Sequence, residues 1–120
     1  MAENSYHSAD ALNAALVAAV TPIVPICDEG VYDGTALTFC TFNHSDVGRV
    51  YANGRPKRLV CLYQLHLCMP SGEDPEPTIG QLREAVFAAG FTFPSTVNAD
   101  DSDGIHRVLE FQGRIGNGEL

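Results

Sequence analysis

The sequence offers few side chains at spacings that support chemistry. Histidines stand at positions 7, 44, 66 and 106, and cysteines at 27, 40, 61 and 68, without a CxxC pair. His66 and Cys68 are two residues apart in a strand-like segment, so they share a face and could offer two metal ligands. Cys61 falls on the opposite face from Cys68 and cannot join that pair. With no further ligand at a workable spacing, we expect structural roles for these residues.

A second candidate for chemistry is the acidic run near the C-terminus. Asp100, Asp101 and Asp103 resemble the start of a calcium-binding loop. However, Gly104 stands at the wrong place for an EF-hand, and no glutamate occupies the last ligand position, so we expect a solvated acidic turn. GxSxG, Walker and HExxH motifs are absent as well. The sequence therefore predicts a protein that is not an enzyme, with no catalytic residues, no bound metal and no cofactor.

Length and composition narrow the class of protein. The 120 residues suit one domain, residues 1–120, and 45% apolar residues are ordinary for a globular protein. The net charge of −8 argues against nucleic-acid binding as the main role and against an anionic membrane surface. No apolar run approaches the roughly 20 residues of a membrane helix, and the N-terminus lacks the basic flank of a secretory signal. The cysteine pattern favours reduced thiols in a protein made in the cytosol.

Two segments have helical periodicity. Residues 8–20 carry apolar side chains at helical spacing, with Ser8 as a candidate N-cap and a Thr-Pro dipeptide just past the end. After the loop SGEDPEP, Thr78 and Gln81 form a capping-box pair at the start of a second helix. Gly90 is suited to end that helix.

The other apolar segments alternate as strands. Expected strands cover residues 36–43, 47–52, 58–69, 91–97 and 105–115. The second and third are joined through Asn53-Gly54, the residue pair best suited to a type I′ turn. This element order predicts an α+β fold: an antiparallel β-sheet with a long β-hairpin and two helices packed on one face.

The turn also predicts how the hairpin is paired. With a two-residue loop, Ala52 pairs with Arg55 beside the turn. Tyr51 then pairs with Pro56, whose missing N–H faces away from its partner strand. Along residues 59–69, one alternating face is suited to the core, and the other mixes polar and apolar side chains, which suits partial cover by another chain or element. We therefore expect an unpaired edge near the tip and a tip that projects beyond the sheet.

Five segments, in this order, carry a resemblance to a known family. They are "ALNAALVAAVTPIVP", "VYDGTALTFCTFN", "RVYANGRPKRLVCLYQLHLCMP", "TIGQLREAVFAAGFTF" and "DDSDGIHRVLEFQGRI". Together they resemble the tail completion, or tail terminator, proteins of long-tailed bacteriophages, over nearly the whole chain. The third segment is similar to that family's tyrosine–turn–proline segment before its long strand, and the last to its acidic turn and final strand, with His106, Glu110 and Phe111. "RPKR" is more basic than the family's turn, and the four cysteines are not part of its pattern.

The resemblance implies a structural virion protein, present in the host cytoplasm during assembly and then at the tail–neck junction. Members of this family form a ring, usually a hexamer, that caps the tail tube, stops its elongation and joins it to the head-side neck or connector protein. DNA passes through the ring without specific binding. An acidic lumen suits that passage, because like charges repel at short range.

Ring assembly suggests a role for the charged residues. In a head-to-tail ring, each subunit offers one patch to a different patch on its neighbour. A basic hairpin tip and acidic loops would form such a pair and would contribute more to register than to affinity. The candidate ring-interface residues are Arg55, Lys57, Arg58, Glu73, Asp74, Glu76, Asp100, Asp101 and Asp103.

Other interpretations stay open. Another neck component, such as a head-side connector or stopper, is also a ring. A small-ligand-binding regulatory module could use two helices on an antiparallel sheet, but it would need a concave pocket with converging polar groups. The basic tip could also be a charged guard that blunts a sheet edge.

Overall fold

The computed structural model describes the backbone of residues 5–6, 8–52 and 54–116, and their side chains except those at 5, 49–52 and 55–57. The molecule is elongated, with extents of 53 × 28 × 21 Å. Along the described chain the elements are β1 (Ser5–Tyr6), α1 (Ala9–Val20), β2 (Cys27–Glu29), β3 (Phe39–Ala52), β4 (Arg55–Met69), α2 (Glu76–Ala88), β5 (Ser95–Asn98) and β6 (Ile105–Gly116).

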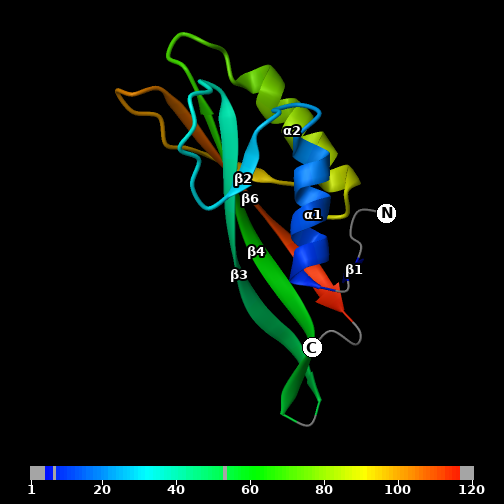
Figure 1. Ribbon diagram of the computed structural model, residues 1–120. Coiled ribbons are helices and arrows are strands. Elements are labelled where there is room, and N and C mark those ends of the chain that lie inside the picture. The colour runs from blue at the N-terminus through cyan, green and yellow to red at the C-terminus, as the bar shows by residue number, and fades with distance from the viewer. Residues whose placement is uncertain (1–4, 7, 53, 117–120) are drawn as a thin grey trace.

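The strands form one sheet with both helices on one face (Figure 1). The strand order is β1-β6-β4-β3-β2. Strand β5 also pairs with β6, along the edge that β1 uses and at a different stretch of the strand. The three long strands β3, β4 and β6 are antiparallel, whereas the short strands β1 and β2 join in parallel. The predicted α+β fold, with a mostly antiparallel sheet and a long hairpin, is confirmed.

The core lies between the helices and one face of the sheet. In β4, Cys61, Tyr63, Leu65, Leu67 and Met69 are buried, as their alternation predicts. They meet a helical stripe from each helix and alternate residues of β3 and β6. These partners are Leu12, Leu16, Val20, Ile79, Leu82, Val86, Cys40, Phe42, Leu109, Phe111 and Ile115.

Helix α1 begins where the sequence predicts. The Ser8 hydroxyl accepts a hydrogen bond from the Ala11 N–H, so it caps the first turn. The buried residues along one side of α1 pack the helix against the sheet. Each fully buried Leu contributes about 1.5–3 kcal/mol to the free energy of folding, relative to an exposed one.

Helix α2 begins three residues earlier than predicted, and the expected capping box is wrong. Pro75 is the N-cap and the helix starts at Glu76, so Thr78 already lies inside the first turn. Proline suits these first positions because their N–H groups have no helical partner. The Asp74 carboxylate accepts a hydrogen bond from the Glu76 N–H instead. Gly90, with φ of 106°, follows the helix as predicted.

Several strand boundaries differ from the prediction. The segments expected at 36–43 and 47–52 form one strand, β3, because continuous pairing with β4 outweighs the polar residues at 44–46. The strand expected at 91–97 starts only at Ser95, since Phe91 is buried in the core and Pro94 lacks a backbone donor. Strands β1 and β2 were not predicted.

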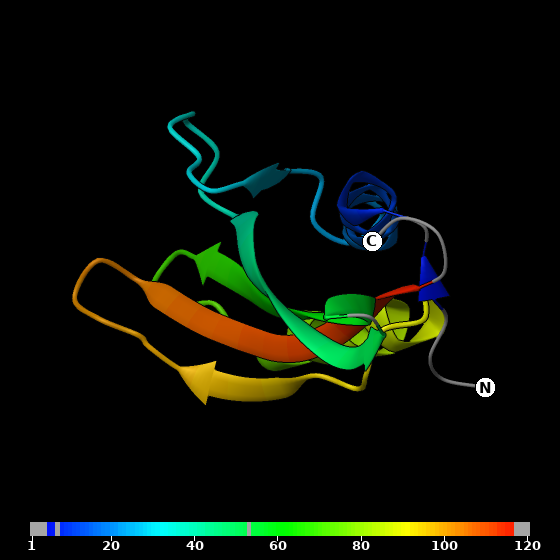
Figure 2. The ribbon, with the colours of Figure 1, turned by 90° about the horizontal axis from the view of Figure 1, so that it is seen from below.

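The hairpin tip extends beyond the rest of the sheet, as predicted (Figure 1). Tyr51 pairs with Pro56 and Ala52 with Arg55, and Gly54 has the positive φ of 75° that the turn requires. Asn53 lies outside the described residues. Pairing between β4 and β6 ends at Arg58 with Gly116, so the described residues of β4 before Arg58 pair only with β3. Seen along the long axis, α1 lies end-on beside the sheet, and the loop of residues 30–38 extends away from the body (Figure 2).

Candidate interaction surfaces

The predicted basic interface residues belong to the start of β4, at one end of the molecule. Arg58 is exposed on β4. Arg55 and Lys57 belong to the same strand, but their side chains lie outside the described part of the chain. At about 3.3 Å per residue, the stretch of β4 from Arg58 to Met69 spans about 36 Å. The basic tip is therefore remote from the loops that follow β4.

The two predicted acidic loops meet at the opposite end (Figure 1). One joins β4 to α2 and the other joins β5 to β6. All of their predicted interface residues are exposed: Glu73, Asp74, Glu76, Asp100, Asp101 and Asp103.

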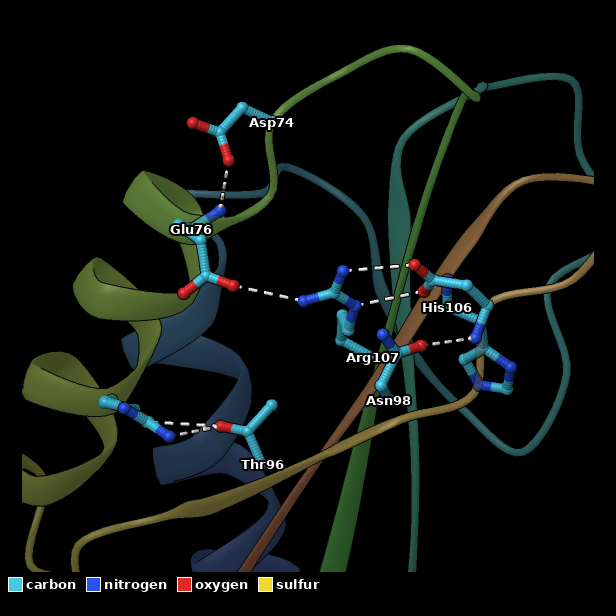
Figure 3. A network of polar contacts seen from close by, with 8 residues as sticks. Asp74, Glu76, Thr96, Asn98, His106 and Arg107 are labelled. Carbon is cyan, nitrogen blue, oxygen red and sulfur yellow. Dashed lines mark hydrogen bonds and ion pairs between the residues drawn. The ribbon is translucent and has the colours of Figure 1, made fainter.

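Arg107 of β6 connects the two acidic loops (Figure 3). Its Nη1 donates to Glu76 Oε2 at 3.1 Å. Its Nε and Nη2 each donate to one carboxylate oxygen of Asp100, both at 3.0 Å. Asp100 also accepts the backbone N–H of His106 at 2.8 Å. These hydrogen bonds lower the pKa of Asp100 below its ordinary value, with the Arg107 bond as the main cause.

The acidic residues therefore divide into two groups. Glu76 and Asp100 bind Arg107, and Asp74 accepts the Glu76 N–H at the start of α2, so these carboxylates serve the fold of their own subunit. Asp101 accepts the N–H of Asp103 at 2.9 Å within a tight turn. Its outer oxygen and the carboxylates of Glu73 and Asp103 are better suited to meet a partner. The sequence predicted all six as interface residues. It could not separate the two groups, because only the fold brings Arg107 close to Glu76 and Asp100.

The metal pair expected as a candidate, His66 and Cys68, has a different arrangement. His66 Nδ1 lies 2.8 Å from His106 Nε2, on the face away from the helices, and its Nε2 lies 3.3 Å from Asn43 Nδ2. Cys68 is the direct cross-strand neighbour of His106. Burial, and then the neighbouring His106, lower the pKa of His66. This pair could not be predicted from the sequence, because α2 and β5 separate β4 from β6 and no local pattern sets the register between these strands.

Sequence reasoning also missed a cluster on the other face. His44 and Asp46 alternate along β3, and Asp46 lies directly opposite Cys61 on β4. One ligand atom from each of the three side chains lies within 4.8 Å of the other two. His44 Nδ1 is 3.2 Å from Asp46 Oδ1, and His44 Nε2 is 3.8 Å from Glu29 Oε2. Burial, followed by the nearby Asp46, raises the pKa of the Cys61 thiol to about 12.

The outer face also carries a hollow of about 550 Å³. Its polar lining includes Asn43, Ser45, Gln64, Glu110 and Gln112. Gln64 Nε2 donates to Glu110 Oε2 at 3.0 Å, so two of these groups already bind each other. Under the ligand-binding interpretation, this hollow is the place for a small molecule.

Comparison with known proteins adds no family to these observations. No protein-family model matches the chain, and no curated protein matches it significantly. Among the described residues, no helix is long and apolar enough to cross a membrane.

Proposed function

We propose that this protein is a structural virion protein of the tail-terminator type. It assembles into a ring, most simply a hexamer, that caps the tail tube of a long-tailed bacteriophage and joins the tail to the head-side neck protein. The resemblance of the five sequence segments supports the family, and the surfaces of the folded subunit support the assembly.

The observation that carries this proposal is the separation of charge along the molecule. The basic hairpin tip and the acidic loops lie at opposite ends of the 53 Å long axis. Two unlike patches at opposite ends cannot contact each other within one subunit. They can do so between neighbours in a head-to-tail arrangement, which closes into a ring when the rotation is right.

The edge of β3 supports assembly as well. Strand β2 covers this edge only at residues 40–42. From Asn43 to Ala52, no strand of the described chain lies along it. A long open edge is a surface that monomeric proteins usually protect, because its N–H and C=O groups invite another chain.

The electrostatic balance fits a conduit for DNA. A net charge of −8 gives the ring walls no general attraction for phosphate, so DNA would pass without being held. A head-side connector or stopper shares these features and is the nearest alternative.

Electron microscopy tests the proposal directly. The purified protein should form rings, whereas a ligand-binding module that works as a monomer would not. Phage that lack the protein should produce filled heads beside separate tails of excessive or irregular length, because tube growth is no longer stopped. Tails of normal length firmly attached to heads would contradict the proposal. Empty or leaking heads beside normal free tails would favour the connector instead.

A further inference from the structure

We propose that His44, Asp46 and Cys61 bind one divalent transition-metal ion of the zinc class, with Glu29 supporting the histidine. The sequence does not predict this site: its candidate metal ligands are His66 with Cys68, and the acidic run of Asp100, Asp101 and Asp103. It also goes beyond the proposed ring function, which requires no metal.

The three side chains suit such an ion by type and by distance. Imidazole, carboxylate and thiolate are the three ligand types that zinc uses in proteins, at about 2.0–2.3 Å from the metal. In a tetrahedral site, two ligands of one ion are therefore about 3.3–3.8 Å apart. The ligand atoms of this cluster lie within 4.8 Å of one another. The distance from His44 Nδ1 to Asp46 Oδ1, 3.2 Å, is already close to the tetrahedral separation.

The strand pairing holds these side chains in place. His44 and Asp46 point to the same face because they are two residues apart on β3. Cys61 is directly opposite Asp46 in the β3–β4 register, and its residue is fully buried. Ligands on paired strands vary little in position, so the cluster is better organised than an equivalent set on loops.

The orientation of His44 is that of a metal ligand with a supporting carboxylate. Its Nδ1 faces Asp46 at 3.2 Å, toward the centre of the cluster. Its Nε2 lies 3.8 Å from Glu29 Oε2, an ion-pair distance that must shorten before a hydrogen bond forms. Histidines that bind metals usually donate their second N–H to a carboxylate, which fixes the ring and makes the first nitrogen a better ligand.

The site is also reachable from water. The side chain of His44 is 17% exposed and that of Asp46 is 39% exposed. Cys61 forms the buried floor. Three protein ligands leave a fourth tetrahedral position on the solvent side, which water can fill.

Metal titration of the reduced, chelator-treated protein tests this inference. We expect one equivalent of Zn²⁺ to bind in competition with a chromophoric chelator. Co²⁺ should give a thiolate-to-cobalt charge-transfer band in the near ultraviolet. Cys61→Ser should abolish this band. Glu29→Gln should keep the band but weaken binding by about 10- to 100-fold, the usual effect of losing a carboxylate behind a metal-bound histidine.

Two matched controls use a histidine and a cysteine outside the cluster, His66 and the partly exposed Cys68. Cys68→Ser and His66→Gln should keep both the stoichiometry and the cobalt band, because these residues lie on the opposite face of the sheet. The inference is overturned if the wild-type protein shows no saturable binding. It is equally overturned if Cys68→Ser removes the band while Cys61→Ser keeps it.

One measurement needs no variant, in case Cys61→Ser does not fold. X-ray absorption at the zinc edge of the loaded wild-type protein should show one sulfur ligand with nitrogen and oxygen ligands. A spectrum with no sulfur, or with two, would overturn the assignment. Ring formation is scored separately by light scattering, so failure of the metal site would not be confused with failure of the ring.

Discussion

Arg107 and Asp100 meet in a two-point contact, with the guanidinium Nε and Nη2 each donating to one carboxylate oxygen at 3.0 Å. This contact fixes the β5–β6 loop onto the strand that follows it. Because Arg107 also binds Glu76 of α2, the same guanidinium sets the position of both acidic loops. We propose that this end contacts a neighbouring subunit. The Arg107 guanidinium of the same subunit therefore holds the proposed contact surface in place.

Acid should weaken this end of the molecule. The folded pKa of Asp100 lies below its value in the unfolded chain. Its contribution to stability is therefore complete above about pH 4 and is lost as pH falls through the folded pKa. Asp100→Asn should lower the melting temperature at pH 6 and flatten its decline as pH falls below about 4. Thermal unfolding followed by circular dichroism measures both.

Asp103→Asn is the control for that experiment, because the Asp103 carboxylate makes no hydrogen bond to Arg107. It should keep the acid profile of the wild type. A profile that changes equally in both variants would mean that general charge, rather than the Arg107 contact, sets the acid sensitivity.

The His66–His106 pair predicts a second pH effect, in a higher range. The folded pKa of His66 is lowered below its ordinary value of 6.5 by burial and by the neighbouring His106. The unfolded chain therefore binds the proton more readily, so stability is complete above about pH 6.5 and falls as pH drops toward the folded pKa. Denaturant unfolding at pH 7.5 and 5.5 should show this loss in the wild type and a smaller loss in His66→Gln. Equal losses in the two proteins would contradict the prediction.

Gly113 is expected to be intolerant of any side chain. A Cβ at this position would lie 2.9 Å from the buried side chains of Leu12 and Phe91, which are fixed by the core. Gly113→Ala should therefore destabilise the protein by about 1–3 kcal/mol, the usual cost of overpacking. Gly80→Ala is the matched control, since it lies inside α2 with nothing within 4 Å. It should be stabilising by about 0.5–1 kcal/mol. Denaturant melts of both variants decide this, and the same sign for both would contradict it.

The features that could be predicted from the sequence are those that a local residue pattern determines. The period-2 alternation of β4 identified its buried face, and Asn-Gly identified the turn and its register. Ser8 identified the start of α1. The missed strands β1 and β2 have two and three residues and pair in parallel with distant partners, so no local pattern reveals them.

The cluster of His44, Asp46 and Cys61 could have been found. The predicted pairs at the turn, continued along both strands, place Asp46 opposite Cys61. Between the turn and Asp46 the pairing shifts by one residue near Lys57 and shifts back near Arg49. Asp46 is therefore opposite Cys61 in the structure as well. It was missed because the polar residues at 44–46 suggested a break between two strands. By contrast, the positions of Arg107 and His106 depend on how β6 pairs with β4. No turn joins these two strands directly, so their register could not be predicted from the sequence.

The basic hairpin provides the last prediction. Reversing Arg55, Lys57 and Arg58 to Glu should leave the subunit folded, because these residues lie at the end of β4 away from the helices, and surface changes away from special features usually shift stability by only about half a kcal/mol. Ring formation should weaken, most strongly at low salt, since screening at high salt shortens the range of charge interactions to about 3 Å at 1 M. Changing Glu73, Asp101 and Asp103 to Lys in the same protein should restore assembly if the two ends meet, whereas Glu84→Lys on the exposed side of α2 should not. Sedimentation across a salt series measures assembly, with circular dichroism as the folding control. A reversed variant that is folded and assembles like the wild type at every salt concentration would show that the tip only guards a sheet edge.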